Sequence, residues 1–182
     1  MLNPLKSERN SPMRIIIASD SFKESLSAGE VCNAISEGWT SVLPGMKIWK
    51  IPFSDGGEGL AEVIIKASGG EIIGTRVTGP LGEPVDAAWG LTGTGDTAII
   101  EMASASGLML IPPERRDPFI TTTCGTGQLI REALMRNVKK IILGIGGSGT
   151  HDAGMGMAKR WELSFLTPMA GRFRRGPGGC WN

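Results

Sequence analysis

The first regular part of the chain is a short apolar run followed by an amphipathic segment. Residues 14–18 (RIIIA) form a β-branched run that predicts a strand buried on both faces. Ser27 and Glu30 have the spacing of a capping box, and apolar residues then recur on one helical face until Pro44. The pattern therefore predicts a strand followed by a helix.

The same order is then repeated. Residues 47–51 (KIWKI) predict a second strand, and residues 60–68 (LAEVIIKAS) predict a helix that ends at Gly69. An order of strand, helix, strand and helix is typical of parallel strands.

The pattern changes after residue 70 to strand-like runs that are joined by glycine-rich turns. The turns GPLGEP and TGTGD are short enough for hairpins. The runs that predict strands are residues 71–78, 85–91 and 97–102. The α/β order then resumes, with a helix expected at residues 127–137, a strand at residues 138–143 and a further helix near Met155.

These elements predict an α/β fold in two parts. We expect a Rossmann- or flavodoxin-like parallel βαβ part and a second, incomplete α/β domain with a mixed sheet. The expected divisions are a polar extension over residues 1–12, the first part over 13–78, the second domain over 79–158 and a tail over 159–182.

Composition narrows the possible partners of this fold. The 182 residues include 19 Lys and Arg against 18 Asp and Glu, so no overall charge favours nucleic acid or an anionic membrane. No apolar stretch approaches the roughly 18 residues of a membrane span, and the polar start lacks the apolar core of a secretory signal. We therefore expect a cytoplasmic protein that binds small molecules, whose oligomeric state the sequence leaves open.

Three polar loops follow predicted strands: residues 19–25 (SDSFKES), 54–59 (SDGGEG) and 144–154 (GIGGSGTHDAG). Ligands of open α/β sheets bind at the carboxyl ends of strands, where glycines allow backbone N–H groups to approach phosphate oxygens. Carboxylates in such loops can hold Mg²⁺ or accept a proton, and a lysine such as Lys23 can neutralise phosphoryl charge.

Each loop has a second interpretation. Gly144, Gly146 and Gly149 fit the GxGxxG spacing of a dinucleotide-binding turn, but no acidic residue ends a following strand to hold a ribose. Thr150 stands where a Walker A loop has lysine. A glycine turn that only packs a helix on a strand remains open beside a phosphate site.

The charged residues of the loops are equally open to a structural interpretation. Asp55 and Glu58 fit a turn before a helix N-terminus, and Asp152 fits a helix cap. Lys23 could be solvated, and His151 is a single histidine without a visible partner.

The combination of motifs resembles the type I glycerate kinase family, in order and with matching spacing. The motifs are RIIIASDSFKESLSAGEV, PFSDGGEGLAEVI, VTGPLGEPVDAAWG, IIEMASASGL, PPERRDP, TTTCGTGQLIREAL and IILGIGGSGTHDAGMGMA, which together cover residues 13–158. The resemblance implies transfer of the γ-phosphoryl group of MgATP to a hydroxyl of D-glycerate. It also implies a two-domain α/β fold with the active site between the domains.

The resemblance assigns roles to residues of the three loops. The implied catalytic residues are Asp20, Lys23, Asp55 and Asp152. The implied substrate or nucleotide ligands are Ser21, Ser25, Gly56, Gly57, Glu58, Gly146, Gly147 and Ser148, with Mg²⁺ at Asp55 and Glu58. In an intact relative, alanine at the position of Asp55 or Asp152 is expected to abolish turnover and to leave the fold stable.

The chain departs from the family in two places. The family's loop usually reads GSATNDGGAG, and Ala153 replaces one of its glycines, which would cost about 1 kcal/mol if that position needs a positive φ. From Lys159 the family pattern AQALGxxFxDxDG is lost, and a shift of two bases with permissible codons restores it. We therefore expect residues 159–182 to be an out-of-frame tail on the N-terminal half of a glycerate kinase. The alternative function is an inactive fragment that retains at most nucleotide or phosphate binding.

Overall fold

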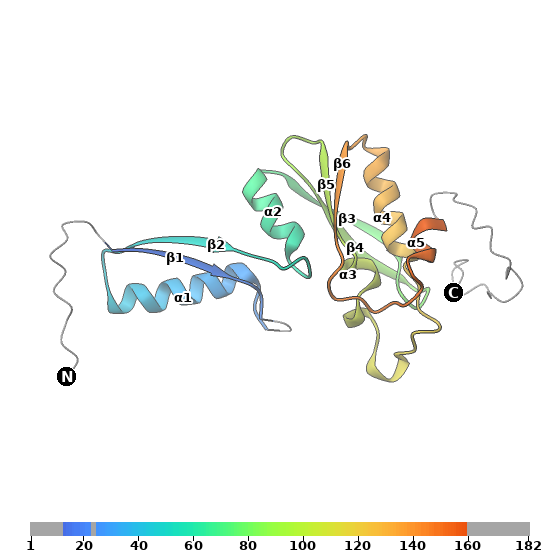
Figure 1. Ribbon diagram of the computed structural model, residues 1–182, viewed down its shortest axis with the longest axis horizontal. Helices are drawn as coiled ribbons and strands as arrows, with labels where there is room; N and C mark the ends of the chain where they lie inside the picture. Colours follow the sequence, from blue (N-terminus) through green and yellow to red (C-terminus); the bar gives the residue numbers. More distant parts are fainter. Residues whose placement is uncertain (1–12, 23–24, 160–182) are drawn as a thin grey trace, which may run out of the picture. The chain divides into compact units, whose positions relative to one another are not determined.

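The computed structural model describes residues 13–22 and 25–159, which divide by packing into two compact units between Ser54 and Asp55. Each unit has its own sheet (Figure 1). The domain boundary that the sequence places after residue 78 stays a prediction. The polar extension, Lys23 and residues 160–182 of the predicted out-of-frame tail lie outside the described residues.

The first unit is a parallel strand pair with one helix. Its elements are β1 (Arg14–Ser19), α1 (Ala28–Val42) and β2 (Lys47–Pro52). β1 and β2 pair in parallel, with Arg14 opposite Lys47. The predicted capping box is confirmed, because Glu30 N donates to Ser27 Oγ at 3.3 Å and Ser27 N donates to Glu30 Oε2 at 2.8 Å.

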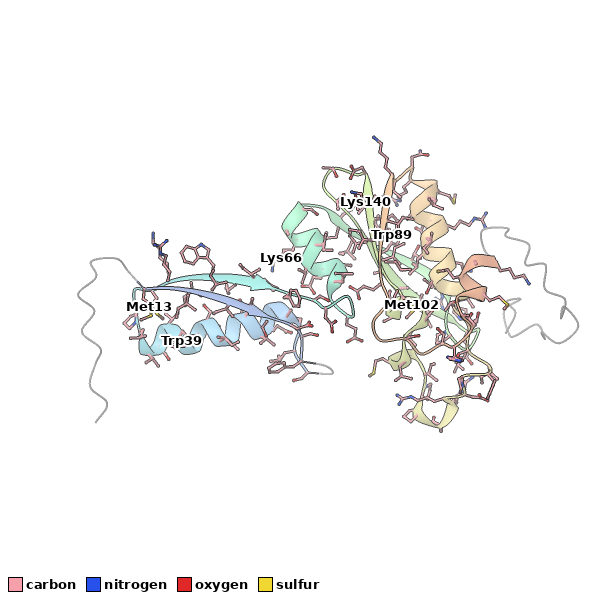
Figure 2. The ribbon with its side chains drawn as sticks, in the orientation of Figure 1. Met13, Trp39, Lys66, Trp89, Met102 and Lys140 are labelled. Carbon is pink, nitrogen blue, oxygen red and sulfur yellow. The ribbon has the colours of Figure 1, made fainter. Side chains whose placement is uncertain are left out.

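Burial of the first strand on both faces was wrongly predicted. Ile17 is 5% exposed and lies on the face that α1 covers, whereas its neighbour Ile16 is 65% exposed. Trp49, which pairs with Ile16, is 44% exposed, and Ile51 on the same face is 51% exposed. Trp39 on α1 (Figure 2) is 43% exposed as well. The reason is that this unit packs a single helix on a single face of two strands.

The second unit is a mixed sheet with helices on both faces. Its strands are β3 (Glu71–Thr78), β4 (Pro84–Leu91), β5 (Thr97–Glu101) and β6 (Lys140–Gly144), in that spatial order. β3, β4 and β5 pair antiparallel through the two predicted hairpins, and β5 and β6 pair parallel. Its helices are α2 (Leu60–Ser68), α3 (Ala103–Ser106), α4 (Cys124–Met135) and α5 (Met155–Lys159), with the 3₁₀ turns η1 (Leu108–Leu110) and η2 (Pro113–Arg115). The mixed α/β fold is thereby confirmed.

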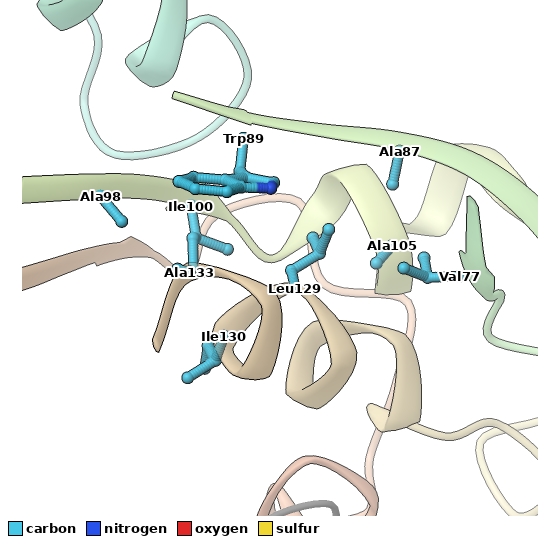
Figure 3. Packing of buried hydrophobic residues seen from close by; sticks show 9 residues of the cluster. All are labelled: Val77, Ala87, Trp89, Ala98, Ile100, Ala105, Leu129, Ile130 and Ala133. Carbon is cyan, nitrogen blue, oxygen red and sulfur yellow. The ribbon is translucent and has the colours of Figure 1, made fainter. Parts of the chain in front are cut away.

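Two apolar clusters hold this sheet between its helices. On one face Trp89 and Ile100 pack with Leu129 of α4 (Figure 3), and all three side chains are completely buried. On the other face Ile99 packs with Ile65 of α2. Each fully buried side chain of this size contributes about 1.5–3 kcal/mol, so this core stabilises the scaffold from which the polar loops emerge. Among the described residues, no helix has the length and apolarity that a membrane crossing requires.

Candidate functional site

Two of the three predicted loops meet at one edge of the second sheet. β5 and β6 run parallel and end together, with Glu101 opposite Gly144. Residues 144–154 follow β6 as the glycine loop, and residues 55–59 lead into α2. Gly146 N donates a hydrogen bond to Gly56 O at 3.2 Å. This is the edge at which α/β sheets bind ligands.

The two loops touch through their backbones, and this contact requires glycine. A Cβ at position 146 would lie 2.6 Å from Gly57 Cα and 3.0 Å from Gly57 N. A Cβ at position 144 would lie 2.6 Å from Gly56 O. The structure therefore brings together Gly56, Gly57 and Gly146, which the sequence assigned to separate loops.

A second segment fixes the glycine loop on both sides of Ser148. Leu108 N donates to Gly147 O at 2.9 Å, and Gly149 N donates to Ser106 O at 3.0 Å. Within the described part of the chain, the N–H group of Gly147 itself donates to no protein atom. Because Gly147 is exposed, this backbone donor is open to an anionic ligand.

Asp152 holds the far end of the glycine loop. Its carboxylate accepts hydrogen bonds from Thr123 N at 2.8 Å, Gly154 N at 3.0 Å and Gly156 N at 3.1 Å. The Thr123 hydroxyl also donates to it at 2.8 Å. These bonds tie the loop to the first turns of α4 and α5, so the geometry favours the helix-cap interpretation. The catalytic role of Asp152 stays a prediction.

A carboxylate also occupies the start of α2. Glu101, at the end of β5, accepts a hydrogen bond from Ala61 N at 2.7 Å. Glu101 therefore occupies a backbone donor of α2, and Asp152 occupies backbone donors at the starts of α4 and α5. The backbone of the glycine loop offers a further place for an anion.

Burial raises the pKa of Glu101, and the negative charges of Glu58 and Glu62 raise it further. Above the ordinary Glu value of 4.5, the folded state therefore binds more protons at this carboxyl than the unfolded state does, and this contribution to stability is lost as the pH rises through the raised pKa. Glu101→Gln keeps an oxygen that can accept from Ala61 N and carries no charge. The wild type and Glu101→Gln would be unfolded in urea between about pH 4 and 8. The variant is expected to be the more stable protein by an amount that grows with pH. Parallel stability curves would contradict this reasoning.

The first unit holds the third loop. Asp20 Oδ1 accepts from Ser21 N at 2.7 Å, and Ser25 N donates to Phe22 O at 2.9 Å. These residues lie after β1, as predicted from the sequence. Their convergence with the two glycine loops stays a prediction.

The candidate Mg²⁺ ligands lie in the loop before α2. Asp55 Oδ1 accepts from Gly57 N at 3.2 Å, a contact typical of an aspartate turn. Its other oxygen has no hydrogen-bond partner among the described residues. Those residues include no group of three or more His, Cys, Asp or Glu arranged for a metal. Magnesium in kinases uses one or two carboxylates with the substrate phosphates. A Mg²⁺ site at Asp55 and Glu58 stays a prediction.

A pocket of about 370 Å³ lies beside the glycine loop. Its floor is partly apolar, with Met102 at the end of β5 (Figure 2). Its polar lining residues are Thr123, Thr126, Ser148, Thr150, His151 and Asp152. Thr123 and Thr126, at the start of α4, were not identified as site residues from the sequence.

Ala153 has the left-handed backbone conformation that its replacement of a family glycine implied. Its φ is +51°, which costs a residue with a Cβ about 1 kcal/mol. Ala153→Gly is therefore expected to raise the free energy of unfolding by about 1 kcal/mol in urea titrations. The matched control Ala158→Gly, inside α5, should lower it by about 0.5–1 kcal/mol. The same sign for both variants would refute strain at Ala153.

Comparison with known proteins decides the family. The glycerate kinase family model matches residues 15–179. The chain belongs to the glycerate kinase family. The matched region extends past Lys159, and the out-of-frame origin of residues 159–182 stays a prediction. The GxGxxG spacing accordingly belongs to a glycine loop of this family.

Several family members are similar to this chain over most of its length. It is 52% identical over 167 residues to a glycerate kinase of Bacillus subtilis (strain 168), covering 92% of this chain and 43% of the relative. It is 53% identical over 147 residues to a glycerate 2-kinase of Escherichia coli (strain K12), covering 81% and 39%. A crystal structure from Salmonella typhimurium LT2, provisionally described as glycerate kinase 2, matches with a TM-score of 0.69 and 52% identity over 81% of this chain and 40% of that one. The chain thus spans about two fifths of the length of these relatives.

Proposed function

We propose that this chain carries the phosphate-binding part of a kinase that transfers the γ-phosphoryl group of MgATP to a hydroxyl of D-glycerate, which gives phosphoglycerate and ADP. The observation that carries the proposal is the backbone contact between Gly146 and Gly56 beside a pocket, in a member of the glycerate kinase family. Backbone donors that are fixed before the ligand arrives stabilise phosphoryl charge without reorganisation.

The proposed roles combine the contacts of the second unit with the roles that the resemblance assigns to Asp20 and Lys23. The Gly147 N–H and the Ser148 hydroxyl bind phosphate oxygens, while Asp152 shapes the loop that presents them. Asp55 and Glu58 hold Mg²⁺, which would neutralise phosphate charge. Asp20 accepts the proton of the glycerate hydroxyl, and Lys23 neutralises the transferring group. The expected partners are glycerate and ATP, and the cytoplasmic location stays a prediction.

A second candidate function is nucleotide or phosphate binding without catalysis. The chain spans about two fifths of the Bacillus subtilis and Escherichia coli relatives. The first unit also exposes apolar side chains on the sheet face that carries Ile16, Trp49 and Ile51. Exposed apolar surface of this kind is typical of a face that another element covers.

Turnover separates the two candidates. ADP formation would be measured with ATP, Mg²⁺ and D-glycerate for the 182-residue chain and, as a positive control, for the full-length Bacillus subtilis relative. Glycerate-dependent turnover by both proteins supports the kinase. Turnover by the relative alone, with ATP binding retained by this chain, supports the binding fragment. The absence of ATP binding by this chain would refute the phosphate site.

A further inference from the structure

A second pocket, of about 230 Å³, adjoins the first one. The two pockets share Ser148, Thr150 and His151, so this stretch of the glycine loop lines both. The rest of the lining of the second pocket is Gly149 and residues from the segment 108–118, which includes the motif PPERRDP. The volume lies below the range of drug-sized sites and suits a small organic molecule.

Arg116 is the lining residue of this pocket that carries a permanent positive charge. Its Nε donates to Ile111 O at 3.2 Å, which orients the guanidinium group. Within the described part of the chain, its two terminal nitrogens make no hydrogen bond or ion pair. The preceding residue differs, since Arg115 pairs with Glu83 at 3.0 Å. Arg115 is therefore paired within the protein, whereas the two terminal nitrogens of Arg116 are available for a ligand.

The acidic residue in the lining of this pocket is Asp117. Asp117 Oδ1 accepts a hydrogen bond from Phe119 N at 2.9 Å, which is a local turn contact. A planar guanidinium with two parallel donors matches the two oxygens of a carboxylate, and such charge-assisted pairs are about twice as strong as neutral hydrogen bonds.

We propose that Arg116 binds the carboxylate of the hydroxy-acid acceptor in this second pocket. The hydroxyl of the acid then faces Ser148, Thr150 and His151. The phosphoryl donor occupies the larger pocket, on the other side of these three residues. This inference rests on the proposed function and adds to it the residue that selects an acid over an uncharged polyol. Arg116 acts here as a binding and specificity residue.

Calorimetric titration of the complete 182-residue chain tests the assignment. D-Glycerate, glycerol and MgATP are titrated separately into the wild type and into Arg116→Gln, Arg116→Lys and Arg115→Gln. We expect Arg116→Gln to weaken D-glycerate binding by about 10- to 100-fold, the effect of losing a charge-assisted pair. Arg116→Lys should retain part of the affinity, because it keeps the charge and loses the fork. Arg115→Gln should bind D-glycerate about as well as the wild type does. The affinities for glycerol and for MgATP should change little in any of the variants.

Three results would overturn the assignment. The first is that Arg116→Gln and Arg115→Gln bind D-glycerate with equal affinity. The second is that Arg116→Gln and Arg116→Lys lose the same amount of D-glycerate affinity. The third is that the wild type does not bind D-glycerate. The first two, with MgATP still bound, would remove this subsite and leave the proposed function standing. If the wild type did not bind MgATP, the proposed function itself would be refuted.

Discussion

Gly146→Ala is expected to lower the free energy of unfolding by about 1–3 kcal/mol and to weaken MgATP binding at least tenfold. The new Cβ would lie 2.6 Å from Gly57 Cα, which is backbone and not the end of a flexible side chain. The glycine loop and the loop before α2 would have to separate, and the hydrogen bond from Gly146 N to Gly56 O would be lost with the contact. Urea unfolding and nucleotide titration measure the two effects.

Gly74→Ala is the matched control for this prediction. Gly74 lies in β3, and a Cβ there meets nothing within 4 Å. The stability of the Gly74→Ala variant should equal or slightly exceed that of the wild type, because alanine reduces the entropy of the unfolded chain. Equal effects of the two substitutions would show that the contact between the loops does not need glycine.

Asp152→Ala is expected to destabilise the fold by about 2–4 kcal/mol, because at least three backbone N–H groups lose their acceptor. These donors belong to Thr123, Gly154 and Gly156, which begin or precede α4 and α5. The sequence alone predicted loss of turnover on a stable fold, and the contacts now change that expectation for this residue.

Asp55→Ala is expected to destabilise the fold less than Asp152→Ala does. Asp55 accepts one hydrogen bond, from Gly57 N, on an exposed loop. Its replacement should cost about 1 kcal/mol or less by chemical denaturation and should reduce Mg²⁺-dependent nucleotide binding. If Asp152→Ala were as stable as Asp55→Ala, the structural role that we assign to Asp152 would be wrong.

The elements with local signals could be predicted from the sequence. The capping box at Ser27, the glycine that ends α2 and the two hairpin turns each act over a few residues, and all were predicted. The segment from α3 to η2 was not predicted. It depends on distant contacts, such as the buried hydrogen bond between Ser106 and Thr126 and the bond from Leu108 N to Gly147 O. The start of α4 at Cys124, before the predicted residue 127, likewise depends on Asp152.

The candidate site divides in the same way. The glycine loops were predicted because their composition reports a backbone requirement directly. Glu101, Thr123 and Arg116 were missed as site residues, since their contacts or pockets join positions far apart in the sequence. Glu101 reaches Ala61 across 40 positions and Thr123 reaches Asp152 across 29. Nothing local in IIEMASASGL or TTTCGTG specifies such a partner.

The most direct test of the phosphate site is an NMR titration of the ¹⁵N-labelled 182-residue chain with MgATP. The account predicts saturable shifts of the Gly147 and Ser148 amides and of the amides of residues 56–58, and their loss in Gly146→Ala. Binding of MgATP that leaves these amides unmoved, or no binding to the folded wild-type chain, would contradict it.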